Sequence, residues 1–595
     1  TGCRAVKLET SIARLFKLKT MNKLLAIIGA ASLALSAQAQ QNEVELTLLE
    51  TSDVHGNYLP YDFINGEAGA GSLARVMTYT DKLRKETGRD HVILLENGDI
   101  LQGQPTAYYY NFIDTTSTHL CADILNYMQY DAGTVGNHDI ETGHAVYDRW
   151  VKQCNFPMLG ANAVETATGK PYWKPYTIIE RKGIKIAVMG MVTPGIPMWL
   201  PQNLWSGLTF TDMAETARRY MPEMKAQADV IVGLFHSGVG KEEGVNQLAE
   251  NAALHVAKSV SGFDVVFCGH DHRRANRTIL NAAGDSVLIL NPAADAMTVA
   301  QAKIKLSMEG NKPTIKWMKG DLIDVSKMQP DPAFMKQFKM ASDVVKSFTN
   351  RTIGHSAHEM KTLPAFFGPS AFIDFIHQMQ LRISGADISF TAPLAFDACI
   401  QQGPIRVRDM FKLYRYENML YVMELSGQEI KDYLEYSYAG WTNQMKNESD
   451  HLLLFKPNAD KIKQPWQRMA TPSYNFDSAA GIRYTVDVSK PTGEKICIES
   501  MADDSPFDLQ KTYRCAINSY RGNGGGNLLT KGAGIKAEDL DKRIVWSTDK
   551  DLRYYLMKAI EEADSISPEP LNLWKFVPAA WTEKAKLRDM ELLKQ

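Results

Sequence analysis

Between residues 43 and 325, short apolar runs alternate with segments that have the pattern of amphipathic helices. Each run ends in polar or glycine-containing residues, and the runs read VELTLLE, HVILLENGD, KIAVMGMV, DVIVGLFHS and FDVVFCGH. The segment GSLARVMTYTDKLRKE is one of the helix-like stretches between them. This alternation predicts a layered α/β domain. Reactive side chains of such folds gather beyond the carboxyl ends of the strands, so a site is expected at the polar strand ends.

The chain has 595 residues, which is too long for one hydrophobic core, so we expect two domains. A second region after the α/β pattern mixes helices with strands such as MLYVMEL and IRYTVDV. The predicted segments are an upstream extension with a signal peptide (1–39), the α/β domain (40–330), a linker helix (331–350), a C-terminal α+β domain (351–548) and a helical tail (549–595).

The segment that begins at Met21 has the pattern of a secretory signal. It reads MNKLLAIIGAASLALSAQAQQN, with a positive start at Lys23, an apolar core over 24–35 and a small-x-small triplet that ends at Ala39. The apolar run is too short to cross a membrane comfortably. We therefore expect cleavage after Ala39, no stable membrane span afterwards, and a periplasmic or secreted protein. Residues 1–20 are interpreted as translated upstream sequence.

Charge and cysteine content exclude some functions. The net charge is −2, from 66 basic and 68 acidic residues, whereas proteins that grip nucleic-acid polymers usually carry a basic excess. A small anionic substrate remains compatible, and no protein partner is evident. No Cys-x-x-Cys pair occurs, which argues against a thiolate zinc site. If an exported form contains a disulfide, Cys497 and Cys515 are the favoured pair.

Five strand ends carry side chains that can bind metals. They are Asp53 and His55 in TSDVHGN, Asp99 in NGDILQG, Asn137 and His138 in GNHDIE, His236 in LFHSG, and His270 and His272 in CGHDH. Each motif alone is also typical of a turn or of a hydrogen-bonded structural histidine. The ordered set of five predicts a metal site instead. Oxygen and imidazole ligands without thiolates suit zinc, manganese, iron or cobalt, and Asp99 is the natural carboxylate to bridge two ions.

This ordered set resembles the calcineurin-like metallophosphoesterase superfamily, and the whole mature chain resembles its exported 5′-nucleotidases and 2′,3′-cyclic-nucleotide 2′-phosphodiesterases. The resemblance implies a four-layer β-sandwich flanked by helices and a C-terminal α+β nucleotide-binding domain. It implies two divalent metal ions, the first held by Asp53, His55 and His272, the second by Asn137, His236 and His270, with Asp99 bridging both. By the same resemblance, Asp139 and Asp271 point away from the ions and serve structure.

The resemblance also assigns the acid of the reaction. His138 matches the catalytic histidine of the family, which stabilises the transition state or protonates the leaving oxygen. Relatives of the 5′-nucleotidase type carry aspartate three residues later, whereas this chain has Glu141. We expect the longer side chain of Glu141 to orient His138.

The second domain is expected to select the phosphoester. The stretch FTAPLAFD (390–397) lacks the glycine run and arginine with which 5′-nucleotidases grip their substrate, and Gly526 stands where they carry aspartate. DMFKLYRYENMLYVMELSG, SYNFDSAAGIRYTVDVSKP and AINSYRGNGGGN instead resemble the periplasmic 2′,3′-cyclic-nucleotide 2′-phosphodiesterase/3′-nucleotidase branch. On this resemblance Tyr416 and Tyr520 sandwich the nucleobase, and Asn137 also contacts the substrate. Without it, each tyrosine is interpreted as a core aromatic.

The expected activity is therefore hydrolysis of 2′,3′-cyclic nucleotides and 3′-nucleotides to nucleoside and phosphate by a two-metal enzyme of nucleotide catabolism. One alternative within the class is a 5′-nucleotidase or nucleotide-sugar hydrolase. An alternative of another class is an inactive nucleotide-binding or surface protein. Arg273 and Arg521 fit either a phosphate contact or a solvated position and stay unassigned.

Overall fold

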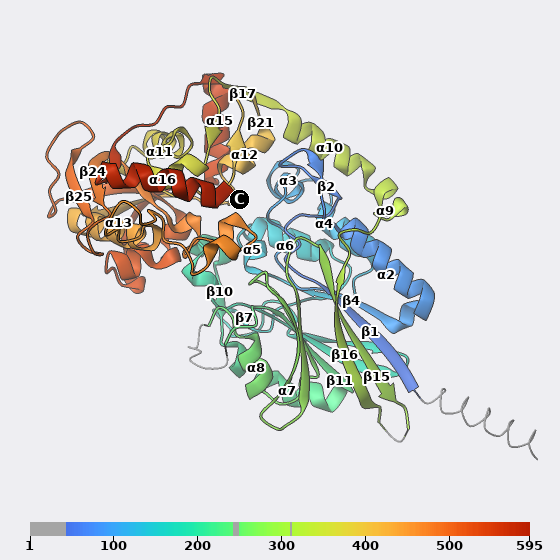
Figure 1. The fold of residues 1–595 in the computed structure, drawn as a ribbon. Helices are drawn as coiled ribbons and strands as arrows, with labels where there is room; N and C mark the ends of the chain where they lie inside the picture. The colour runs from blue at the N-terminus through green and yellow to red at the C-terminus, as the bar shows by residue number, and fades with distance from the viewer. Residues whose placement is uncertain (1–42, 242–248, 310–311, 595) are drawn as a thin grey trace, which may run out of the picture.

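The computed structural model describes residues 43–241, 249–309 and 312–594 (Figure 1). The interpreted signal segment and the residues before it lie outside this range. The first half of the described chain forms two large sheets with helices around them. The second half forms smaller sheets and helices beside that body (Figure 1).

The first sheet has six strands in the order β16-β15-β1-β4-β5-β6. The strands β1, β4, β5 and β6 run parallel, so their carboxyl ends share one edge. The last two strands of the domain return antiparallel beside β1. The bounds are Glu43–Thr51 (β1), Val92–Glu96 (β4), Ala132–Thr134 (β5), Met158–Leu159 (β6), Thr298–Ser307 (β15) and Thr314–Asp324 (β16).

The second sheet has the order β13-β14-β12-β11-β9-β8. Its four inner strands are parallel, and β8 and β13 are antiparallel edges. The bounds are Tyr176–Arg181 (β8), Ile184–Val192 (β9), Val230–His236 (β11), Val265–Cys268 (β12), Arg274–Leu280 (β13) and Ser286–Pro292 (β14).

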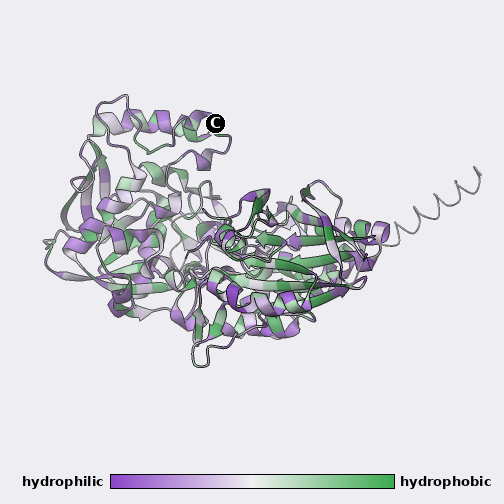
Figure 2. Cartoon of the chain, turned by 90° about the horizontal axis from the view of Figure 1, so that it is seen from below, coloured by the Kyte–Doolittle hydropathy of each residue, from purple (hydrophilic) through white to green (hydrophobic). Residues whose placement is uncertain are grey.

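A continuous apolar core joins the two sheets face to face. Leu48 and Ile93 of the first sheet and Val232 and Leu290 of the second are fully buried in it. Figure 2 shows strands of this body with apolar colouring. Removing such side chains from water is the main favourable term, worth about 25 cal/mol per Å² of apolar surface. The strands are apolar on both faces because helices cover their outer sides.

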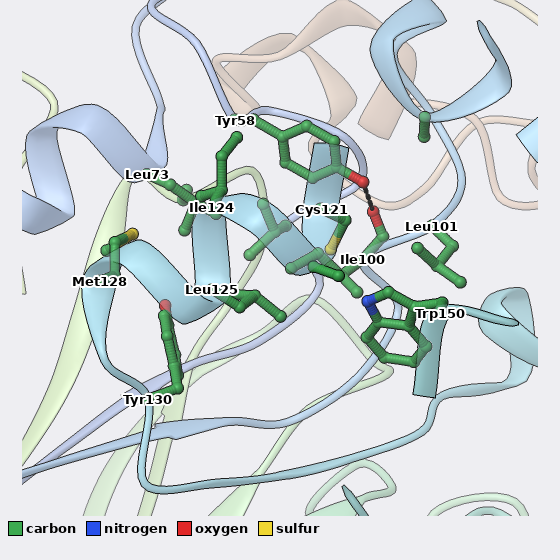
Figure 3. Close-up of a cluster of buried hydrophobic side chains, with 14 of the residues drawn as sticks. Tyr58, Leu73, Ile100, Leu101, Cys121, Ile124, Leu125, Met128, Tyr130 and Trp150 are labelled. Carbon is green, nitrogen blue, oxygen red and sulfur yellow. Dashed lines mark hydrogen bonds between the residues drawn. The ribbon is translucent and has the colours of Figure 1, made fainter. Parts of the chain in front are cut away.

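The outer helices complete the predicted four layers. The first sheet is covered by Leu73–Thr87 (α2), Leu120–Met128 (α4) and His144–Gln153 (α6), and the second by Met213–Gln227 (α7) and Ala253–Ser259 (α8). Figure 3 shows Leu73, Ile124, Leu125 and Trp150 packed in the first of these outer cores. The predicted α/β sandwich is therefore confirmed.

The connection between the two halves is a pair of helices rather than the single predicted helix. Pro332–Gln337 (α9) and Lys339–Asn350 (α10) meet at Phe338, whose backbone leaves the helical conformation (φ −100°, ψ 15°). The Phe338 ring is buried in the core of the first domain. Burial of this aromatic side chain accompanies the break in the helix.

The second half is built around a five-stranded mixed sheet of order β23-β19-β26-β22-β27. Beside it lie two three-stranded sheets, β21-β17-β28 and β25-β24-β29, and a two-stranded sheet of Met360–Lys361 (β18) and Cys399–Ile400 (β20). The central strands are Ile388–Thr391 (β19), Leu420–Ser426 (β22), Ser478–Ala480 (β23), Thr512–Asn518 (β26) and Ile544–Ser547 (β27). The flanking strands are Thr352–Ser356 (β17), Gly403–Arg406 (β21), Ile482–Asp487 (β24), Ile496–Met501 (β25), Ser565–Ile566 (β28) and Trp574–Val577 (β29).

Helices cover this sheet, and the C-terminal stretch belongs to the same body. The helices are Ala371–Ser384 (α11), Val407–Leu413 (α12), Gly427–Trp441 (α13), Ser519–Gly522 (α14), Leu552–Ala563 (α15) and Ala579–Lys594 (α16). The described residues 549–594 are mostly helical, but they also supply β28 and β29, which pair with β17 and β24.

The disulfide favoured from sequence is wrong. Both thiols are free, and Cys497 on β25 is exposed whereas Cys515 on β26 is buried. The two strands belong to different sheets, so neighbouring positions in the sequence do not become neighbours in space. Separately, each helix within the described ranges is too short or too polar to cross a membrane.

Asp589 anchors the terminal helix α16. Its fully buried carboxylate accepts hydrogen bonds from the backbone N–H groups of Leu452 (2.8 Å) and Leu453 (2.9 Å). The Asp589→Ala substitution leaves both donors buried without a partner, so we expect it to lower the free energy of unfolding by about 2–4 kcal/mol. Urea unfolding followed by tryptophan fluorescence measures this, with the exposed Glu591→Ala as control. Equal midpoints for both variants would show that Asp589 does not hold the helix.

Candidate metal centre

The candidate ligands lie at the joined carboxyl edges of the two sheets. From the first sheet, Asp53 and His55 follow β1 and Asp99 follows β4, while Asn137 begins the short helix Asn137–Ile140 (α5) after β5. From the second, His236 ends β11, and His270 and His272 follow β12. Each group of strands is parallel, so the face-to-face sandwich brings the polar ends together.

Six of these side chains form two compact groups. Asp53, His55 and His272 make the first, and Asp99, His236 and His270 the second, with the ligand atoms of each group within 4.8 Å of one another. In the first group the His272 Nε2 atom is 3.0 Å from His55 Nε2 and 3.3 Å from Asp53 Oδ1.

The second group includes the seventh predicted ligand. His236 Nε2 is 3.1 Å from Asp99 Oδ2. Asn137 Oδ1 is 3.2 Å from His236 Nε2 and 2.8 Å from His270 Nδ1. The structure thus brings all seven residues named from the sequence to one place.

Hydrogen bonds to backbone carbonyls orient two of the imidazoles. His55 Nδ1 faces the Gln102 oxygen at 3.2 Å, and His236 Nδ1 faces the Asn97 oxygen at 2.6 Å. A carbonyl can only accept, so each Nδ1 carries the proton and donates. The neutral ring then directs the Nε2 lone pair at the neighbouring ligand atoms.

The lone pairs of the carboxylate, imidazole and amide atoms lie so close together that they repel one another unless a positive charge lies between them. Burial opposes a charge on His236, but Asp99 and Asp53 outweigh it and raise its pKa to about 9. Burial and His272 lower the pKa of His55 to about 4. Either protons or cations can supply the charge, and a cluster of imidazole, carboxylate and amide oxygen atoms fits divalent transition metals. The donor set therefore fits the two-metal site expected from the sequence.

Five candidate ligands have left-handed backbone conformations. The φ angles are 51° for Asp53, 49° for His55, 55° for Asp99, 71° for His270 and 53° for His272. Residues other than glycine rarely occupy this region, and each instance costs about 1–3 kcal/mol. Such strain clusters at functional sites, where the surrounding fold holds it in place.

The two acidic residues predicted to face away from the ions accept hydrogen bonds from neighbouring loops. The buried Asp139 carboxylate accepts from the N–H groups of Asp99 (2.9 Å), Ile100 (2.9 Å) and Gly136 (2.7 Å). Asp271 accepts from the Asn291 amide at 3.0 Å and from the Arg273 N–H at 3.0 Å. Arg273 therefore contributes its backbone N–H to this turn.

His138 lies beside the second group with a carboxylate behind it. Its backbone N–H donates to Asp99 Oδ1 at 2.8 Å, and its ring Nδ1 is 2.5 Å from Glu141 Oε2. The longer glutamate does reach the histidine, because α5 places residues three apart on one side. Burial opposes a charge on His138, but Asp99 and Glu141 together raise its pKa to about 10.

Two residues that sequence reasoning missed support His270. Glu250 accepts a hydrogen bond from His270 Nε2 at 2.9 Å, which leaves the lone pair on Nδ1, the ring nitrogen beside Asn137 Oδ1. The Trp199 ring stacks on the His270 ring, with centroids 5.5 Å apart and planes 22° apart. Neither residue belongs to a recognisable motif, so only the folded chain reveals them.

The second domain contacts the first beside the candidate ligands. Asn523, three residues after Tyr520, donates its amide to the Trp199 carbonyl at 3.4 Å. Tyr416 lies in the loop between α12 and β22, and Tyr520 lies on α14; both rings are half-buried. The predicted base-stacking residues therefore stand on the side of the second domain that meets the first.

Two family models match the chain. The calcineurin-like phosphoesterase model matches residues 46–274, and the model of the 5′-nucleotidase C-terminal domain matches residues 352–531. These segments correspond to the sandwich and to most of the second half.

Relatives match across almost the whole chain. A 2′,3′-cyclic-nucleotide 2′-phosphodiesterase/3′-nucleotidase of Salmonella typhimurium is 27% identical over 94% of this chain and 92% of its own length. The protein of the same name from Haemophilus influenzae is 26% identical, with the same coverage. A trifunctional nucleotide phosphoesterase of Bacillus subtilis is 26% identical over 91% of this chain, which spans only 39% of that protein.

Solved structures show the same fold. A candidate 5′-nucleotidase of Staphylococcus aureus, in complex with alpha-ketoglutarate, superposes with a TM-score of 0.73 at 23% identity, covering 89% of this chain and 99% of that one. With both domains matched in sequence and in architecture, the chain belongs to the calcineurin-like metallophosphoesterases that carry a 5′-nucleotidase C-terminal domain, a family of metal-dependent phosphoric ester hydrolases.

Proposed function

We propose that the chain hydrolyses 2′,3′-cyclic nucleotides and 3′-nucleotides to nucleoside and phosphate. The observation that carries the proposal is the pair of ligand groups with the His138–Glu141 dyad beside it, facing a domain with two half-buried tyrosines. Relatives named for this activity match 93–94% of the chain. A 5′-nucleotidase of Vibrio cholerae, by contrast, matches 41% of it.

We assign the ions as the family pattern suggests. Asp53, His55 and His272 would hold the first, Asn137, His236 and His270 would hold the second, and Asp99 would serve both. Zinc, manganese, iron and cobalt all suit these atoms. When bound, two such cations make hydroxide available near neutral pH and neutralise charge on the phosphoryl oxygens.

The chain's own residues supply the proton and the orientation. Glu141 engages Nδ1 of His138, so Nε2 is the ring nitrogen that can meet the substrate. A protonated His138 stabilises the charge on the phosphoryl group and donates to the leaving oxygen. Asp99, with one oxygen on the His138 N–H and the other beside His236, couples the acid to the metal site.

Tyr416 and Tyr520 bind the nucleobase between them. Stacking on aromatic faces tolerates different bases, so both purine and pyrimidine nucleotides are expected substrates. Export to the periplasm or medium is proposed on the pattern of residues 21–39 alone.

The first test is product release by the chain from Gln40 with added Mn²⁺ or Zn²⁺. The substrates are 2′,3′-cAMP, 3′-AMP, 5′-AMP and UDP-glucose. We expect turnover of the first two, and a loss of about 10²–10⁴-fold in kcat for His138→Ala with metal content unchanged. His144→Ala on α6 is the matched histidine control.

Preference for 5′-AMP would keep the metal site and identify the alternative, a 5′-nucleotidase. No turnover of any substrate would favour an inactive nucleotide-binding protein.

A second prediction concerns Glu141. Asp99 and Glu141 both favour the protonated form of His138, and Glu141 is the one whose side chain contacts the ring. The Glu141→Gln variant should lower the His138 pKa, move the alkaline limb of the kcat–pH profile to lower pH, and reduce kcat about tenfold or more. Glu141→Asp should give a smaller shift because it keeps the charge. An unmoved alkaline limb in Glu141→Gln would show that another group carries the proton.

A third prediction concerns the base site. Replacing Tyr416 and Tyr520 together with alanine removes stacking worth about 1–3 kcal/mol per aromatic contact, so KM for 3′-AMP should rise at least tenfold. Hydrolysis of p-nitrophenyl phosphate, which has no nucleobase, should be spared. Equal losses on both substrates would mean that the tyrosines support the fold instead.

A further inference from the structure

The loop SYNFD (473–477) lies beside Tyr520, although it is more than forty residues away in sequence. It contains the 3-10 turn Ser473–Asn475 (η8), and its Tyr474 side chain is 36% exposed. More than a third of this aromatic side chain is therefore accessible to solvent or to a ligand.

One guanidinium fastens this loop to the base site. Arg521 is 1% exposed and follows Tyr520 directly. Its Nε and Nη2 atoms contact the two oxygens of Asp477 at 3.2 and 3.0 Å, and Nη2 also donates to the Tyr474 carbonyl at 2.7 Å. Its Nη1 donates to Asn475 Oδ1 at 3.1 Å and to the Gly525 carbonyl at 2.6 Å.

All five donors of Arg521 are therefore used. A buried ion pair stabilises one geometry only when its hydrogen bonds are satisfied, as they are here. The Tyr520 ring lies 5.5 Å from the guanidinium carbon. Arg521, left unassigned from sequence, is thus the common support of the Tyr474 and Tyr520 segments.

The glycine loop after Arg521 packs closely against both Tyr520 and Arg521. A Cβ on Gly525 would lie 2.6 Å from the Tyr520 ring, and one on Gly526 would lie 2.0 Å from the Arg521 guanidinium. Gly526 also has φ +72°, which favours glycine. The glycine run is therefore needed for the Arg521 contacts.

Arg521 joins the Tyr474 backbone to the Tyr520 ring, and the Tyr474 side chain stays partly exposed beside them. Burial, together with the nearby hydroxyls of Tyr520 and Tyr416, raises the pKa of Tyr474 to about 12, and the Glu250 carboxylate contributes as well. Glu250 is the hydrogen-bond partner of His270. Tyr474 is therefore close enough to Tyr520, Tyr416 and Glu250 for their charges to act on it.

We propose that Tyr474 is a third aromatic contact of the nucleobase, and that Arg521 is the positioning residue that holds Tyr474 and Tyr520 at a fixed separation. This inference rests on the proposed nucleotide substrate. As a base contact that Arg521 holds beside Tyr520, Tyr474 raises affinity for the nucleoside without touching the phosphate. Its hydroxyl also offers a hydrogen-bond donor and acceptor to the edge of the base.

The test is calorimetric binding of adenosine, which has a base but no phosphate. Tyr474→Ala should weaken adenosine binding about tenfold and raise KM for 3′-AMP by a similar factor, with kcat and p-nitrophenyl phosphate hydrolysis unchanged. Tyr474→Phe should keep most of the affinity. Trp466→Ala, which removes a 54% exposed aromatic of the same domain, is the matched control and should change nothing.

Arg521→Lys tests the positioning role. Lysine keeps a charge opposite Asp477 but cannot make the five bonds, so adenosine binding should weaken while p-nitrophenyl phosphate turnover remains. If Tyr474→Ala binds adenosine like the wild type while Tyr416→Ala and Tyr520→Ala bind it weakly, the inference is wrong and the proposed function stands. If the wild type neither binds adenosine nor hydrolyses nucleotides, both are overturned.

Discussion

Where the two sheets meet, the lone pairs of seven candidate ligands point at one small region, which must therefore hold positive charge. The surrounding residues fix the ligand side chains in these orientations. Backbone carbonyls of Asn97 and Gln102 hold the inner nitrogens of His236 and His55 as donors, so the outer nitrogens point at the centre. The ligand loops accept left-handed backbone angles to do so. The fold tolerates this backbone strain because each loop follows a parallel strand that is buried on both faces, and the packing of that strand holds the loop in place.

The carboxylates near this centre have two roles: some contact a charged side chain, and others accept hydrogen bonds from backbone N–H groups. Asp139 is one residue from His138, yet its oxygens are taken by backbone N–H groups of the Asp99 loop. Glu141, two residues further on, reaches the His138 ring. The short helix α5 separates these roles, because it directs the side chains of Asp139 and Glu141 to different sides.

The second domain uses buried arginines to present its aromatic residues. Arg521 ties the Tyr474 loop to Tyr520. Arg553 donates to the carbonyls of Tyr414 and Arg415, directly before Tyr416, and to the Glu417 carboxylate directly after it. Arg553 also lies 5.0 Å from the Tyr108 ring of the first domain, so the segment that carries Tyr416 is linked to the domain interface. The chemistry thus resides in one domain, and the recognition we propose resides in the other.

The sequence by itself indicated a layered α/β domain with metal-binding side chains at its strand ends, because a buried parallel strand needs a continuous apolar run and its polar end has a fixed place in the fold. The four-layer sandwich and the set of seven ligands followed from the resemblance of its motifs to a known family. The sequence could not determine that Cys497 and Cys515 stay apart, since sheet membership depends on pairings distant in the chain. Nor could it identify Glu250 or Trp199, which have no motif and reach His270 only through tertiary contacts. Tyr474 lies in a segment that resembles the family, but only the Arg521 contacts of the folded chain place that segment beside Tyr520. Strand periodicity is a local property of the chain, whereas the partners of a histidine or an arginine are set by which distant segments the folded core brings together.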